Sequence, residues 1–308
     1  MLNYLIRRVF TSILVLFGVS VLVFSVIHLV PGDVTMAILG RQKVSEEKVA
    51  ELREQLGLND PIYVQYGRYL NNALHGDLGV SIRNYLPVSD SIAEQMPSTV
   101  ALAISALTIA LGIGGILGLL AALRHGTWFD TLVMGLSVSG LSIPTFWMGL
   151  LLILLFSVRL KLFPSISTGS SPADLFLPAL TLGLPEAAVV ARMVRASMLD
   201  VLGREYITTA RAKGLPERLV IFKHALRNAL IPVVTFVGLQ MAYLLGGATI
   251  VETMFARQGI GRLAVQSIYS RDYPVVQGVV LVTAAIYVLI NTLTDITYVF
   301  LNPKIRLK

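Results

Sequence analysis

The chain has 308 residues with a net charge of +7; 55% of them are apolar, only 14% are charged, and the mean hydropathy is +0.74. A soluble domain carries about 25% charged residues, so this composition indicates an integral membrane protein and excludes a disordered chain. The absence of cysteine excludes disulfides and cysteine-ligated metal sites.

Six stretches are apolar enough to form transmembrane helices, each of which needs about 20 apolar residues. They cover residues 9–30, 98–123, 131–158, 175–194, 229–251 and 275–301. The fourth is the least regular, because Pro178, Pro185 and Glu186 interrupt it. The first follows Arg7 and Arg8, but it is longer than the apolar region of a signal peptide and no cleavage site follows it. It is interpreted as an uncleaved anchor.

The distribution of charge predicts the orientation of the chain in the membrane. Six spans place both termini on one side, together with 14 basic and 4 acidic residues. The opposite side carries 11 basic and 12 acidic residues. Because cytoplasmic loops are enriched in lysine and arginine, both termini are predicted to be cytoplasmic. Topology then explains the basic excess, so the expected partner is the lipid bilayer and not a nucleic acid.

The predicted fold is all-α and polytopic, and the chain divides into four parts. Residues 1–30 form the N-terminal end and the first span, and residues 31–97 form an external segment. Residues 98–301 form a five-helix transmembrane domain that includes a long cytoplasmic connection, 195–228, and residues 302–308 form a cytoplasmic tail. Within the external segment, the patterns at 45–56 and 62–74 predict two short helices.

The cytoplasmic connection has the pattern of two helices joined by a tight turn. Residues 196–213 predict the first helix. Gly214 stands where a left-handed residue ends a helix, and Pro216 opens the next at a position that needs no N–H. Apolar residues of the second helix recur at Leu219, Phe222 and Leu226, among basic neighbours. This amphipathic helix either rests on anionic lipid headgroups or docks a cytoplasmic partner, and the pattern favours neither.

The sequence contains no recognisable catalytic, metal or nucleotide site. It has no phosphate-binding loop of the G-x-x-x-x-G-K-[ST] type, no G-x-S-x-G elbow, and no histidine with a second ligand at metal-binding spacing. No cofactor is therefore expected in this chain. The glycine-rich stretch in the second span indicates close helix packing instead, because Ala110, Gly114, Gly118 and Ala122 recur every four residues.

Polar residues and helix breaks inside the spans are candidates for a solute pathway or gate. They are Pro144, Pro185, Glu186 and Gln240. Hydrogen bonding between helices is the structural alternative for the polar side chains, and proline is in any case common in membrane helices.

Two cytoplasmic motifs carry a family resemblance. Residues 205–214 read EYITTARAKG and residues 224–232 read HALRNALIP, which together resemble the signature called the EAA loop in permeases of ABC importers. Further matches to the peptide/nickel class, typified by dipeptide and oligopeptide permease B subunits, are LVPGD at 29–33, HGDLG at 75–79, RDYPVVQG at 271–278 and NPKIR at 302–306. The resemblance covers essentially the whole chain. Two features depart from the general EAA pattern, namely its start at Thr208-Thr209-Ala210 and the longer stretch from Gly214 to Pro232, and both are usual in the peptide class.

The resemblance implies a type I importer permease fold in a bacterial or archaeal cytoplasmic (inner) membrane. It implies a homologous second permease, two cytoplasmic P-loop ATPases that bind ATP and Mg²⁺, and an external solute-binding protein. This chain would then be a permease and not an enzyme. A coupling helix at 215–227 would sit in a groove of one ATPase. The ATPase-coupling residues implied are Ala210, Lys213, Gly214, Leu215, Leu219, Phe222, Leu226 and Arg227.

The resemblance implies dipeptides or oligopeptides as the expected substrates. Nickel, glutathione, opines and oligosaccharides are alternatives within the same importer class. A stand-alone secondary transporter and a membrane enzyme are more distant alternatives, because neither an inverted repeat nor a catalytic constellation is evident.

Overall fold

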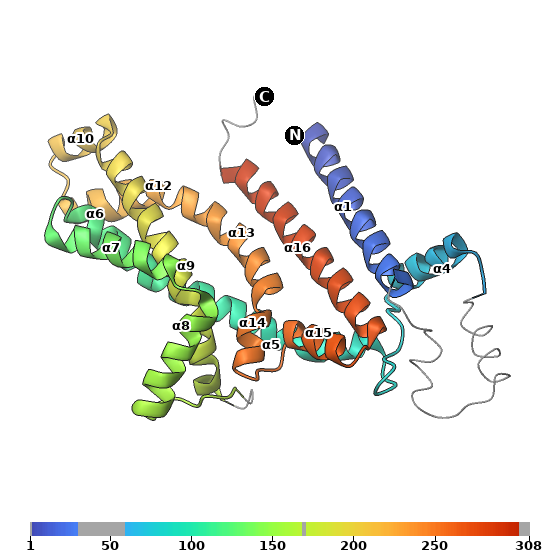
Figure 1. Ribbon diagram of the computed structural model, residues 1–308. Helices are drawn as coiled ribbons and strands as arrows, with labels where there is room; N and C mark the ends of the chain where they lie inside the picture. Colours follow the sequence, from blue (N-terminus) through green and yellow to red (C-terminus); the bar gives the residue numbers. More distant parts are fainter. Residues whose placement is uncertain (1, 30–58, 168–170, 302–308) are drawn as a thin grey trace. The chain divides into compact units, whose positions relative to one another are not determined.

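The computed structural model describes residues 2–29, 59–167 and 171–301, and within these ranges it is helical apart from turns and one isolated bridge between Val80 and Pro87 (Figure 1). The all-α prediction is confirmed. The helix predicted at 45–56 and the tail 302–308 lie outside the described residues. The chain divides into two compact units: residues 1–99 with 259–292, and residues 100–258 with 293–308.

The first unit contains α1 (Leu2–Leu29), α4 (Ile62–Leu74), the start of α5 (Val88–Ile109), α15 (Ile260–Tyr269) and most of α16 (Tyr273–Leu301). Its core is made of buried side chains from α5, α15 and α16. They are Val88, Ile92, Ile260, Val275 and Val279. The buried carboxylate of Asp272 accepts hydrogen bonds from Ser81 Oγ at 2.5 Å and from Ile82 N at 3.1 Å. These bonds hold the turn after α4 against the start of α16.

The second unit is organised around α9 (Pro172–Leu202), which contacts most of its other helices. These helices include the π-helix η1 (Ala110–Gly114), α6 (Gly115–Leu123), α7 (Trp128–Ser142) and α8 (Thr145–Leu152). The unit also contains the π-helix η2 (Ile153–Arg159), α13 (Ile231–Gly247) and α14 (Thr249–Met254). A long central helix that touches several neighbours gives this unit one continuous scaffold.

The predicted stripe of small residues forms the contact between η1/α6 and α9. All four residues of the stripe are buried. A Cβ added to Gly114 would collide with the carbonyl of Ala187, and one added to Gly118 would collide with the carbonyl of Ala191. Only glycine therefore allows the two backbones to approach this closely, as the four-residue spacing predicts.

Among the described residues, four helices are long and apolar enough to cross a membrane, and two bent helix pairs bring the number of candidate spans to as many as six. The stretch predicted at 131–158 is the more sharply bent, by 107° between α7 and α8. Pro144 causes this break, because the residue before a proline avoids the helical region and Ile143 is extended, with ψ 122°. The stretch predicted at 229–251 belongs to the second pair, bent by 45° at Leu230.

Prolines in α9 do not have the predicted effect. Pro178 and Pro185 were expected to interrupt the fourth span, but both lie inside one continuous helix of 31 residues. Leu177, Ala187 and their buried neighbours hold this part of α9 against surrounding helices on several sides. Tertiary packing therefore keeps the helix intact where local preference alone favours a break.

Candidate functional site

The segment that carries the EAA-like motif folds into two helical arms, which we call the elbow, residues 205–229. The first arm is α10 (Glu205–Ala212). The second is a helical run made of α11 (Glu217–Leu219), the π-helix η3 (Val220–Leu226) and α12 (Arg227–Ala229). The single helix predicted at 196–213 is wrong: α9 ends at Leu202, and Arg204 is extended, with ψ 145°, before α10 begins. The elbow is thus separated from α9 by a turn of its own.

Gly214 makes the turn between the two arms possible. Its φ is +75°, in the left-handed region that other residues enter at a cost of roughly 1–2 kcal/mol, so the predicted conformation is confirmed. Gly214 N donates to the carbonyl of Arg211 at 2.9 Å, which closes the end of α10. Pro216 then precedes the second arm, and its carbonyl accepts hydrogen bonds from the first residues of that arm, including Leu219 N at 2.9 Å.

Polar contacts link the two arms across the turn. Arg211 donates to both carboxylate oxygens of Glu217, at 2.6 Å and 3.1 Å. This hydrogen-bonded carboxylate raises the pKa of the Arg211 guanidinium. At the far ends of the arms, Asn228 Nδ2 donates to the hydroxyl of Tyr206 at 2.9 Å. Because both contacts are exposed to solvent, each is expected to contribute little to the free energy of unfolding.

The inner side of the elbow packs against α9. Its buried residues form one apolar cluster with α9 and with the start of α13. The cluster contains Val190, Val194, Met198, Ile207, Ala210, Val220, Ala225, Ala229 and Val233. The elbow is therefore fixed to the scaffold helix through its apolar side, while its outer side stays exposed.

The predicted coupling residues are divided between these two sides. Lys213, Gly214 and Arg227 are exposed, as are Leu219 and Phe222, with exposed fractions of 37% and 58%. Ala210, with an exposed fraction of 7%, belongs to the buried cluster, and Leu215 and Leu226 are half-buried against it. These last three side chains support the elbow from inside this chain.

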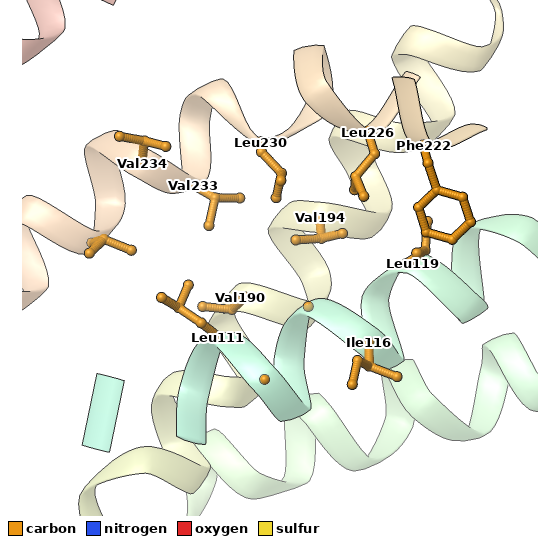
Figure 2. Close-up of a pocket in the computed structure, with 13 residues that line it drawn as sticks. Leu111, Ile116, Leu119, Val190, Val194, Phe222, Leu226, Leu230, Val233 and Val234 are labelled. Carbon is orange, nitrogen blue, oxygen red and sulfur yellow. The ribbon is translucent and has the colours of Figure 1, made fainter. Parts of the chain in front are cut away.

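Two of the predicted coupling residues, Phe222 and Leu226, also line an apolar groove of about 580 Å³ within the second unit. Figure 2 shows η1/α6 on one side of the groove, η3 and α13 on the other, and α9 between them. The lining consists of Leu111, Gly112, Gly115, Ile116, Leu119, Val190, Val194, Phe222, Leu226, Leu230, Val233, Val234 and Val237. Phe222 and Leu226 point into this groove (Figure 2).

The four pathway candidates are not gathered around this groove, since none of them belongs to its lining. Pro144 is exposed at the bend between α7 and α8, whereas Pro185 and Glu186 are half-buried within α9. Gln240 is half-buried on α13. Their role in a pathway stays a prediction. Within the described ranges, no group of three or more histidine, aspartate or glutamate side chains is placed to hold a metal ion.

A buried ion pair that sequence reasoning missed joins the start of α7 to α9. Arg195 Nε and Nη2 donate to the two carboxylate oxygens of Asp130 at 2.5 Å and 2.7 Å. Asp130 has an exposed fraction of 3%, and it also accepts from Gly126 N and contacts His125 Nδ1, both at 3.1 Å. Thr127 and Asp130 give a local signal for the start of a helix. No local signal identifies Arg195, 65 residues away, as the partner of Asp130.

Comparison with known proteins decides the family. Residues 114–307 match the family described as binding-protein-dependent transport system inner membrane component, and residues 1–103 match the N-terminal family of the same transport system membrane component. The chain belongs to this family. It is an inner-membrane permease of an ABC importer of the peptide/nickel class, which implies partner ATPases and a binding protein in general.

Relatives in other bacteria match over the whole length of the chain. The glutathione transport system permease protein GsiC of Escherichia coli K12 is 46% identical over 309 residues, covering 100% of both chains, and GsiC of Shigella flexneri serotype 5b matches equally well. Among solved structures, the inward-facing MetNI methionine ABC transporter has a TM-score of 0.57 at 21% identity, covering 68% of this chain and 96% of that one. This likeness confirms the predicted type I importer fold.

Proposed function

We propose that this permease forms half of the translocation pathway of an importer for short peptides of the glutathione type. The full-length identity of 46% to glutathione permeases carries this proposal. It narrows the expectation of dipeptides or oligopeptides to a small, charged peptide and gives glutathione precedence over nickel, opines and oligosaccharides. Because the external binding protein selects the solute in such importers, the permease is proposed to pass what that protein delivers.

The proposed assembly has this chain beside a homologous second permease, with two cytoplasmic P-loop ATPases bound to the pair. ATP and Mg²⁺ would be bound and used in the ATPases, because this chain has no phosphate-binding loop. Both termini and the elbow are proposed to lie on the cytoplasmic side, where the basic residues are concentrated.

The elbow is proposed to couple ATP use to movement of the membrane helices. Its exposed side offers Tyr206 on α10, Lys213 and Gly214 at the turn, and Leu219 on the second arm. An apolar side chain flanked by polar ones is typical of a helix that docks in a protein groove. Its buried side is continuous with α9 through Val194 and Ala225. A push on the elbow would therefore be transmitted to the scaffold helix of the second unit.

The test is uptake of labelled glutathione into proteoliposomes that contain the purified importer. The binding protein is added to the compartment that the external side of the importer faces. We expect uptake that requires ATP and that unlabelled glutathione abolishes. A dipeptide in large excess is the matched competitor, and a nickel salt is the competitor from another class. Uptake of a dipeptide or of nickel, with none of glutathione, would contradict the proposed substrate and leave the importer assignment intact.

A further inference from the structure

The short helix α4 packs side-on against α1 through an aromatic contact. Tyr66 lies with its ring centroid 5.3 Å from that of Phe24 and 6.2 Å from that of Phe17, both edge to face. Tyr69 also contacts Phe24, at 5.7 Å. The Tyr66 hydroxyl is 2.8 Å from Ser20 Oγ, within hydrogen-bonding distance. These contacts fix both the position of α4 along α1 and the side that α4 turns towards it.

The contact lies within the membrane-spanning part of α1. The span covers Ile6–Ser25, and the α4 contacts run from Phe17 to Phe24. Figure 1 shows α4 lying across α1 near its end. With 13 residues, α4 is about 20 Å long and too short to cross a hydrocarbon core of about 30 Å.

A second side of α4 carries apolar residues that are largely exposed within the described part of the first unit. Tyr63, Gly67, Leu70 and Leu74 follow one another at i, i+4, i+7 and i+11 and so form one stripe along the helix. Tyr63 and Leu74 have exposed fractions of 73% and 78%, and Leu70 is half-buried. We call this set the α4 stripe.

The opposite side of α4 is polar. Arg68 pairs with Asp60 at 2.7 Å, and Asn72 is exposed. Asn72 is nine residues from Tyr63, which is two and a half helical turns and places it on the far side of the helix. A helix with one apolar side, a polar opposite side and tyrosines is typical of the membrane–water interface.

We propose that α4 lies in the membrane–water interface beside α1, with the α4 stripe in contact with lipid and Asn72 in water. The occupant is lipid because the stripe continues an existing lipid-facing surface. The adjoining part of α1, which spans the membrane, exposes apolar Phe17, Val21 and Leu22. Ser20 and Tyr66 hold α4 against this part of α1, and an interfacial helix buries its apolar side by about 5–10 Å into the acyl-chain boundary.

This position gives α4 a mechanical role that differs from that of the elbow. It holds α4 at one depth beside α1, through an aromatic contact on one side and lipid on another. The inference depends on the chain's location in the membrane and not on which solute is carried, so it stands or falls separately from the glutathione proposal.

The test uses spin labels on the complete importer in nanodiscs of phosphatidylcholine and phosphatidylglycerol. The chain has no cysteine, so single-cysteine variants need no other change. Tyr63→Cys and Leu74→Cys report on the α4 stripe, and Asn72→Cys is the matched control on the same helix. All three side chains are exposed, so labelling removes no buried contact. Collision rates with oxygen, which concentrates in lipid, and with a water-soluble nickel chelate are measured at each position.

We expect the oxygen-to-nickel collision ratio at positions 63 and 74 to be several-fold higher than at position 72. Equal ratios at the three positions would show that the α4 stripe is in water and would overturn the proposal. Protection of positions 63 and 74 from both reagents would also overturn it, because it would show that another protein chain covers the stripe.

Discussion

The scaffold around α9 and the elbow that follows it are built in opposite ways. The scaffold uses backbone contacts that admit no side chain at Gly114 and Gly118. It also uses an ion pair whose carboxylate, Asp130, is almost fully buried. The elbow is buried on one side only, and its Arg211–Glu217 ion pair lies in solvent. The difference teaches that tight packing is concentrated in the helices around α9, while the elbow keeps an exposed outer surface.

The largest expected effect is on the scaffold ion pair. Asp130→Ala leaves the Arg195 guanidinium in a mostly buried position without its carboxylate, which costs about 3 kcal/mol when one partner of a buried pair is removed. We expect a clear fall in the thermal unfolding midpoint of the detergent-solubilised protein. Asp200→Ala is the control, since it removes an exposed pair with Arg204 and should leave the midpoint unchanged. Equal midpoints for the two variants would contradict the contrast.

The glycine contact gives the next effect. Gly118→Ala places a methyl group against the backbone of Ala191 and is expected to cost about 1–3 kcal/mol through overpacking. Gly115→Ala, three residues earlier, points into open space and should be neutral or stabilising by up to about 1 kcal/mol, because alanine favours helix. Unfolding midpoints measured side by side test this pair. A larger loss for Gly115→Ala would show that the close approach to α9 is not what the stripe provides.

The turn of the elbow is expected to affect function more than stability. Gly214→Ala forces a side chain into the left-handed region, at a cost of about 1–2 kcal/mol that a displaced turn can relieve. We expect the unfolding midpoint to fall slightly and ATP-dependent uptake to fall severely, because the arms no longer meet at the same angle. Gly76, which also has a positive φ but lies after α4, is the matched site for Gly76→Ala. Equal losses of uptake in both variants would contradict the claim that the turn at Gly214 has a specific role in transport.

The smallest effect concerns the exposed pair across the turn. Glu217→Gln removes the charge that Arg211 binds while keeping the shape of the side chain. Because both side chains are about half exposed, we expect no measurable change in the unfolding midpoint and a modest loss of uptake. A loss as large as that of Gly214→Ala would show that the ion pair, and not the glycine, sets the angle of the elbow.

Local signals predicted the parts of this fold that depend on local chemistry. The stripe from Ala110 to Ala122 and the left-handed Gly214 follow from side-chain size and backbone conformation, so spacing alone revealed them. The break before α10 falls at Gly203, which ends α9 with a φ of −82° and not in the left-handed conformation expected of a terminating glycine. The continuity of α9 through Pro185 and the Asp130–Arg195 pair both depend on tertiary packing between distant segments, which no local pattern specifies.

The candidate site was predicted in the same uneven way. The sequence indicated which segment forms the elbow and where it turns. It did not indicate that Ala210 would be buried or that Phe222 and Leu226 would point into a groove of the same chain, because an amphipathic period does not identify the surface that its apolar side meets.

The most direct test of the account is cross-linking from the exposed side of the elbow. Thr208→Cys places the only cysteine of the chain on the outer side of α10. With a short bifunctional reagent that joins this thiol to lysines, we predict a cross-link to an ATPase subunit in the assembled importer. Asn72→Cys, proposed to face the external water, should give none. Absence of the Thr208 cross-link in an importer that hydrolyses ATP and transports, or an equal cross-link from Asn72, would contradict the proposed coupling through the elbow.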